Sequence, residues 1–170
     1  MSSFFGLFKR KSAGYQLADV YVKLRSQVLA SAPSAQPSPE AVWGVVMETG
    51  YDEAVASVVA LADDTVSMYF SNGGGCIGLG GQEGPRTAGR ALLALAPRFI
   101  NYCQPSVQFP LPAKGNTRFF ILTRNGVFTA EVSEADLGYQ RHPLSPLFHK
   151  TQELITEIRK ADEATKSAKP

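Results

Sequence analysis

The residue types and spacing most suggestive of chemistry lie in a glycine-rich stretch, residues 71–84. A strand-like run leads into this stretch and a helix-like run follows it. Backbone amides of such a loop, together with a helix N-terminus, can hold a phosphate or a carboxylate. Arg86 and Arg90, one helical turn apart, would add two positive charges. The candidate ligand-binding residues are therefore Gly73, Gly74, Gly75, Arg86 and Arg90.

The known nucleotide-binding fingerprints are absent from this stretch. No Lys-Ser or Lys-Thr pair follows a glycine at the phosphate-loop spacing. Glu83 stands where a dinucleotide-binding loop has its third glycine, and its charge would repel an anion. The alternative interpretation is a wide loop that lets the chain cross the edge of a sheet.

The cysteines and histidines give no catalytic or metal-binding pattern. Cys76 lies ahead of the helix-like run, where thiol pKa values fall, but a nucleophilic thiol also needs a base. His142 and His149 lie far along the chain, so Cys76 is better interpreted as a small packing residue. Two histidines seven residues apart match no metal-ligand spacing. We find no enzyme motif and expect neither a cofactor nor a metal.

Aromatic residues give a different lead. They lie on predicted strands, on a turn at Tyr51 and in a proline-rich loop. Exposed aromatic side chains beside loops are typical of protein interfaces. The alternative is that helices of the same chain cover them. The candidate protein-binding residues are Trp43, Tyr69, Phe109 and Phe120.

Length, charge and cysteine content limit the function classes. A chain of 170 residues is expected to form one domain. Its formal charge of +2 arises in part from Lys9-Arg10-Lys11, so no broad basic face for nucleic acid is expected. Two cysteines make no disulfide framework, which favours the cytoplasm. The aromatic run Phe4–Phe8 precedes the basic triplet, the reverse of a signal peptide, and we expect no membrane contact.

The first half of the chain predicts a helix and three strands. Apolar residues at three-and-four spacing, Leu17, Val20, Tyr21, Leu24 and Val28, predict a helix over about residues 15–30. A linker of Ser, Ala, Pro and Gln follows over residues 31–39. Strands are predicted at 42–47, 54–61 and 66–70, although the second could also be a helix. Alternation in the third strand places Val66, Met68 and Phe70 on the core face.

The second half predicts two more helices and a hairpin. A helix begins at Pro85 and ends at Pro97. Residues 101–116 read as a long loop, functional or mobile. Asn125-Gly126 predicts a tight hairpin turn. Phe119, Ile121, Thr123, Phe128, Ala130 and Val132 would then share one face, and Phe120, Leu122 and Val127 the other.

A hairpin apolar on both faces needs cover on both sides, either from helices or from a partner subunit. A closing helix is predicted from Ser145-Pro146. The fold class is therefore α+β, with an antiparallel sheet of about five strands in the order α-β-β-β-α-β-β-α. We expect a flexible segment over residues 1–14, a single domain over 15–160 and a frayed tail over 161–170.

This order of elements is similar to that of the bacterial type III secretion chaperones, small homodimers that hold an extended segment of a partner. The similarity covers most of the chain and lies in the element order alone. Tyr69-Phe70-Ser71 before the triple glycine, and Leu111-Pro112 with Arg118-Phe119-Phe120, look like segments of small uncharacterised bacterial proteins, a resemblance that implies no activity.

We therefore expect a non-enzymatic, chaperone-like homodimer that binds another protein in the cytoplasm. The proposed surface is the second face of the sheet with the loop over residues 101–116. The alternative is a domain that binds an anion or a phosphorylated small ligand through the glycine-rich stretch.

Overall fold

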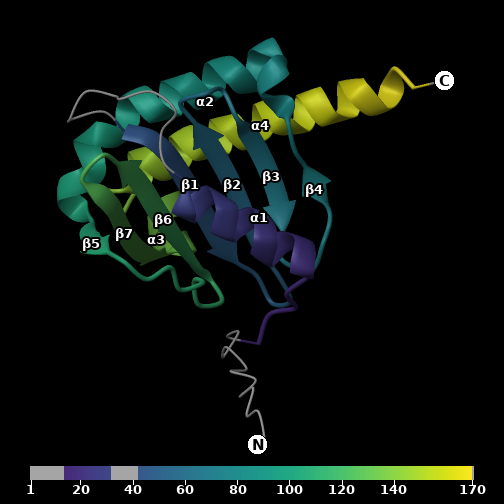
Figure 1. Cartoon of the computed structure of the whole chain (residues 1–170). Coiled ribbons are helices and arrows are strands. Elements are labelled where there is room, and N and C mark those ends of the chain that lie inside the picture. The colour runs from purple at the N-terminus through teal and green to yellow at the C-terminus, as the bar shows by residue number, and fades with distance from the viewer. Residues whose placement is uncertain (1–13, 32–41, 170) are drawn as a thin grey trace, which may run out of the picture.

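Seven strands form one antiparallel sheet with helices on both of its faces (Figure 1). The computed structural model describes residues 14–31 and 42–169. The strand order is β4-β3-β2-β1-β6-β7-β5. The strands are β1 Val42–Gly50, β2 Val55–Leu61, β3 Val66–Phe70, β4 Gly75–Cys76, β5 Gln104–Ser106, β6 Asn116–Thr123 and β7 Gly126–Ser133. The α-helices are α1 Asp19–Ala30, α2 Glu83–Leu95, α3 Glu134–Gly138 and α4 Ser145–Ser167, with single 3-10 segments η1 Leu79–Gly81 and η2 Ala96–Tyr102.

The α+β class is confirmed, and the sheet is larger than the pattern predicted. The two additional strands, β4 and β5, come from the glycine-rich stretch and the proline-rich loop, where short strands leave no alternation to detect. The segment predicted as a strand over 54–61, with a helix as the alternative, is a strand over Val55–Leu61. The closing helix continues through Ser167, with Ala161 buried, so residues 161–167 are helical and not a frayed tail. The predictions for residues 1–13 and 32–39 lie outside the described residues.

The hairpin β6–β7 has the predicted faces but a different turn. Its two-residue turn is Arg124-Asn125, and Thr123 pairs with Gly126. Phe119 faces Ala130 across the ladder. The predicted turn would have opposed Phe119 to Val132, two positions further along β7. Because a shift of two residues preserves the side-chain alternation, every residue stays on its predicted face.

Helices of the same chain cover both faces of the sheet. One face, which includes Met47, Met68 and Phe119, packs against α2 and α4. The other face, which includes Val46, Tyr69 and Phe120, packs against α1 and the segment containing Phe109 and Leu111. In Figure 1, α1 lies across β2 and β3 in front of the sheet, while α2 and α4 lie behind it. No helix in the described ranges is long and apolar enough to cross a membrane.

A charged pair, Arg25 and Glu48, lies between α1 and the sheet. Glu48 on the central strand β1 is fully buried, and Arg25 of α1 binds it with two hydrogen bonds, Nε to Oε1 at 2.7 Å and Nη2 to Oε2 at 2.9 Å. The Ser57 hydroxyl donates to Oε1 at 3.1 Å, and it lies 3.0 Å from the Tyr21 hydroxyl. Burial, together with the Glu48 carboxylate, raises the pKa of Tyr21. The centre of this interface is therefore polar and hydrogen-bonded rather than apolar.

The polar residues form one row across four strands. Ser57, Glu48, Arg118 and Glu131 stand opposite one another in the ladders of β2, β1, β6 and β7. Arg118 pairs with Glu131 and donates to the Thr129 hydroxyl at 3.1 Å.

Hydrogen bonds with Arg25, Tyr15 and Glu131 hold residues 101–116, the segment that the sequence predicts as a functional or mobile loop. Arg25 Nη2 donates to the Phe109 carbonyl at 2.9 Å, and the Ala113 amide donates to Glu131 at 2.7 Å. The Tyr15 hydroxyl donates to the Pro112 carbonyl at 2.8 Å. Together with η2 and β5, these bonds make residues 101–116 an ordered cover of the sheet. The second face and this loop are thus occupied by the chain itself, and are not the open surface that we expected.

The outer strands of the sheet are both short. At one edge β4 has two residues, and at the other β5 has three, with Pro105 in the middle. Proline has no amide hydrogen to offer a further strand.

The Arg25–Glu48 pair generates the first prediction. Arg25→Ala would leave a buried carboxylate without its cation, so we expect the free energy of unfolding to fall by about 3 kcal/mol or more. Replacing both partners, Arg25→Met with Glu48→Met, removes the unpaired charge and should cost less than the single change. Urea denaturation measures both, with Lys23→Ala on the exposed side of α1 as the control. A loss below 1 kcal/mol for Arg25→Ala would contradict this role of the pair.

Glu131 generates a pH prediction. Burial pushes the pKa of Glu131 upward, but the Ala113 amide, the Asn116 side chain and the Arg118 charge outweigh it and lower the pKa below 4.5. A carboxyl group with a depressed folded-state pKa stabilises above its unfolded pKa and loses that contribution as the pH falls through the folded value. The stability difference between the natural chain and Glu131→Gln should therefore shrink below about pH 4.5. Urea midpoints from pH 7 to pH 3 test this, with the exposed Glu153→Gln as the control, and a constant difference would refute it.

Candidate functional site

The structure does not bring the predicted anion-binding residues together. Gly73 and Gly74 form the turn between β3 and β4, beyond Phe70, and Gly75 begins β4. Arg90 instead binds Asp64, at the turn that precedes β3, through two hydrogen bonds of 2.8 and 2.7 Å. The two ends of β3 are about 13 Å apart at the usual rise per residue. The glycine triplet is a hairpin turn, and Arg90 has a carboxylate partner.

The first turn of α2 also has a carboxylate of the chain beside it. Glu157 of α4 lies against Gly84, where a Cβ atom would come within 2.6 Å of Oε2. A helix N-terminus favours negative charge, and here Glu157 supplies it. The negative charge that the anion-binding alternative would take from solution is supplied at this helix start by Glu157 of the same chain.

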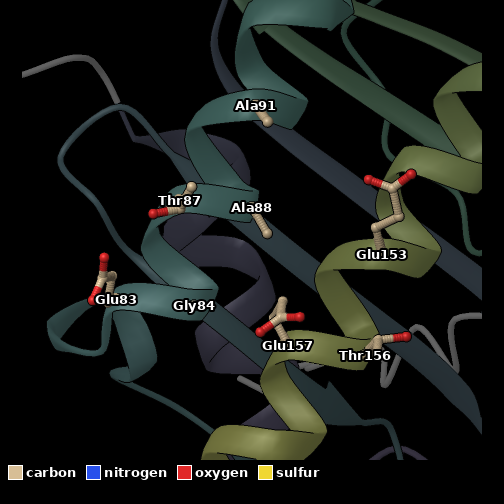
Figure 2. Close-up of a pocket in the computed structure, with 8 residues that line it drawn as sticks. All are labelled: Glu83, Gly84, Thr87, Ala88, Ala91, Glu153, Thr156 and Glu157. Atoms are coloured by element: carbon tan, nitrogen blue, oxygen red, sulfur yellow. The ribbon is translucent and has the colours of Figure 1, made fainter.

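A groove runs between α2 and α4 next to this contact. Figure 2 shows Ala88 and Ala91 of α2 facing Glu153 and Glu157 of α4 across it. The remaining lining residues are Glu83, Gly84, Thr87 and Thr156. Lys150 pairs with Glu153 and Lys160 with Glu157, so part of this negative charge is neutralised. This α2–α4 groove has no aromatic side chain and no unpaired cation for specific recognition.

Cys76 ends strand β4 and has Asp162 and Lys166 of α4 as its charged neighbours. Burial raises the pKa of its thiol, and the neighbouring Asp162 carboxylate of α4, as hydrogen-bond partner and as negative charge, acts in the same direction. Burial also raises the pKa of Cys103 to about 11. A lowered thiol pKa, which a reactive Cys76 would need, is not what this environment gives: burial first, and then the Asp162 carboxylate, raise the pKa of the thiol.

Three of the four predicted protein-binding aromatics are buried. Trp43, Tyr69 and Phe120 lie in the cluster beneath α1, and Tyr69 meets Tyr21 edge-to-face at 5.7 Å. Phe109 is partly buried against Phe120, with ring centroids 5.8 Å apart. These residues hold the cover on the sheet, which is the alternative that the sequence left open.

Two other aromatic side chains are exposed at one end of the sheet. Tyr51, on the turn between β1 and β2, is 49% exposed, and Phe70, at the end of β3, is 37% exposed. Both line a hollow of about 550 Å³, which we call the Tyr51 hollow. Its other lining residues are Gly50, Asp52, Glu53, Ala54, Asn72, Gly115 and Glu134. Four segments distant in sequence therefore meet here.

The Tyr51 hollow combines aromatic surface with negative charge. Three carboxylates line it, those of Asp52, Glu53 and Glu134. Burial and the Glu134 charge raise the pKa of Tyr51, while Arg159 of α4 opposes this. Tyr51 is thus a neutral phenol at physiological pH and not a phenolate nucleophile. Aromatic faces next to carboxylates attract cations, so the hollow is suited to a basic side chain.

The sequence held weak signals for this site. The sequence predicts Tyr51 on a turn, whereas the alternation in β3 predicts Phe70 for the core; Phe70 is the last residue of β3 and is exposed. Glu134 belongs to α3, whose start is marked by Ser133, three residues before Asp136. Among the described residues, no group of three His, Cys, Asp or Glu side chains could hold a metal ion.

Comparisons with protein-family models, with curated proteins and with solved structures found no match to this chain.

The Cys76 environment generates a labelling prediction. Because its pKa is raised, Cys76 should react with iodoacetamide at pH 7.5 more slowly than a free thiol, for which the thiolate fraction is set by a pKa of about 8.5. Asp162→Asn removes the negative charge and replaces the charged acceptor with a neutral amide, so labelling should accelerate by about two- to fivefold. Mass spectrometry of the Cys76 peptide measures the rate, with the Cys103 peptide as an internal control. Equal rates before and after the substitution would show that Asp162 does not act on this thiol.

Proposed function

We propose that the protein is a non-enzymatic protein-binding module and that it binds its partner at the Tyr51 hollow. The observation that carries the proposal is the pair of exposed aromatic side chains, Tyr51 and Phe70, in a hollow lined by carboxylates. Large aromatic side chains contribute heavily to binding energy when a partner covers them.

The chemistry of the hollow defines the partner. A segment with a lysine or arginine next to an apolar residue would place its cation over an aromatic face and near Asp52 or Glu134. Its apolar neighbour would cover Phe70. The partner is therefore expected to present a basic and apolar segment.

We also propose that the protein forms a homodimer, for a reason other than the apolar hairpin. The hairpin β6–β7 does not require a second copy, because α1 on one side and α2 with α4 on the other cover its two faces. Apolar side chains stay exposed next to the β5 edge, at Tyr102 and Val107, and a homodimer would bury them there.

Selection of peptides from a random library tests the hollow. The natural chain should enrich peptides with a basic residue adjacent to an aromatic or aliphatic one, and Tyr51→Ala with Phe70→Ser should weaken binding of these peptides at least tenfold. Tyr139→Ala is the matched control, because Tyr139 is 75% exposed but lies outside the hollow.

Two results would contradict the proposal. The first is enrichment of acidic or phosphorylated peptides that depend on Arg86 and Arg90, which would support the anion-binding alternative. The second is peptide binding that Tyr139→Ala weakens as much as the double substitution does.

A further inference from the structure

The chain approaches the Tyr51 hollow from its own N-terminal side. Gly14 lies beside Lys114, with a Cβ position 3.8 Å from Nζ, and Lys114 directly precedes Gly115 of the hollow. The Gln16 amide donates to the Glu53 carbonyl at 3.2 Å. The Ala18 amide donates to the Ser71 carbonyl at 2.7 Å, next to Asn72 of the hollow. Residues 14–18 thus run along one rim.

The sequence that precedes Gly14 has the chemistry that the hollow is suited to bind. Phe4-Phe5-Gly6-Leu7-Phe8 is followed directly by Lys9-Arg10-Lys11. This is a basic segment adjacent to apolar side chains, as the hollow requires. Three cations would meet three carboxylates, those of Asp52, Glu53 and Glu134.

We propose that residues 4–11 of the same chain bind in the Tyr51 hollow and compete with the partner segment. This inference rests on the proposed function, since it assigns a resident ligand to the same site. The free protein is then self-blocked, and a partner must displace its N-terminal segment.

The length of chain permits this contact within one molecule. Lys11 is three residues from Gly14 and Phe8 is six, so their reaches are about 11 Å and 21 Å in extended chain. A tether this short gives an effective concentration in the millimolar range. Even a weak contact would therefore be populated intramolecularly in preference to the same segment of a second copy.

Nearby cations limit the strength of the contact. Lys114 lies at the rim and Arg159 acts on Tyr51, and both would repel the basic triplet. The segment therefore relies on its aromatic residues as well as on charge, with Phe8 or Phe5 against the exposed rings. A contact of this kind is displaceable, as competition with a partner requires.

Zero-length carbodiimide cross-linking of the full chain tests the contact. We expect Lys9 or Lys11 to couple to Asp52, Glu53 or Glu134 in the monomeric fraction. The carboxylates of the α2–α4 groove, Glu83, Glu153 and Glu157, are the matched control and should not couple. Phe5→Ser with Phe8→Ser keeps the lysines and should lower the yield at least threefold.

Three cross-linking results would overturn the inference. Equal coupling to the α2–α4 groove would indicate an unspecific basic segment. Coupling only between isotopically mixed chains would place the segment on a second copy. An unchanged yield in the Phe5, Phe8 variant would indicate charge attraction without docking of the aromatic residues.

Peptide affinity separates this inference from the proposed function. Lys9→Gln with Arg10→Gln and Lys11→Gln should bind a library-selected peptide about fivefold more tightly than the natural chain, because the competing segment is weakened. Equal affinity of both chains would overturn the inference and leave the proposed function standing. Failure of both chains to bind any basic and apolar peptide would overturn the proposed function, while cross-linking would still decide whether the segment docks.

Discussion

A carboxylate that water cannot reach sets the architecture of this protein. Glu48 sits in the middle of the sheet, and its charge is tolerable only while Arg25 and Ser57 surround it. Arg25 arrives on α1, so the helix must lie at one position over the sheet. The same guanidinium holds the Phe109 carbonyl, which ties the long segment before β6 to the helix. One polar centre therefore aligns three elements that apolar contacts alone would place less specifically.

That centre also explains where reading the sequence succeeded and where it failed. The faces of β6 and β7 followed from alternation, because a register shift of one residue would move every apolar side chain of a strand to the opposite face of the sheet. The buried face of α1 followed in part. Tyr21 is buried as the apolar spacing predicts, and Leu17, Leu24 and Val28 pack against the same cluster, but Val20 is exposed. Hydrophobic periodicity did not find Arg25, because it does not count a charged residue toward a buried stripe. For the same reason the strand at Val42 seemed to end at Met47, although it continues through Glu48 to Gly50.

The candidate site was harder to predict because it depends on which parts of the sheet the helices leave exposed. Aromatic residues are common in protein interfaces, but three of those predicted there, Trp43, Tyr69 and Phe120, belong to the core because α1 covers them. Phe70 has the alternation of a core residue, but it is the last residue of β3 and is exposed. Tyr51 and Glu134 are 83 positions apart and meet through the sheet register and the position of α3. Such a meeting follows from topology, and no local pattern of residues encodes it. The glycine triplet, by contrast, is a distinctive local pattern that forms no binding site, because it serves a hairpin turn.

The blunt outer strands have a consequence for how this protein can associate. In the part of the chain that the structure describes, a two-residue strand closes one margin and Pro105 interrupts the other. Such short outer strands, one of them with a central proline, disfavour the addition of a further strand at either margin. Association by side-chain contacts is therefore favoured over the pairing of strand edges.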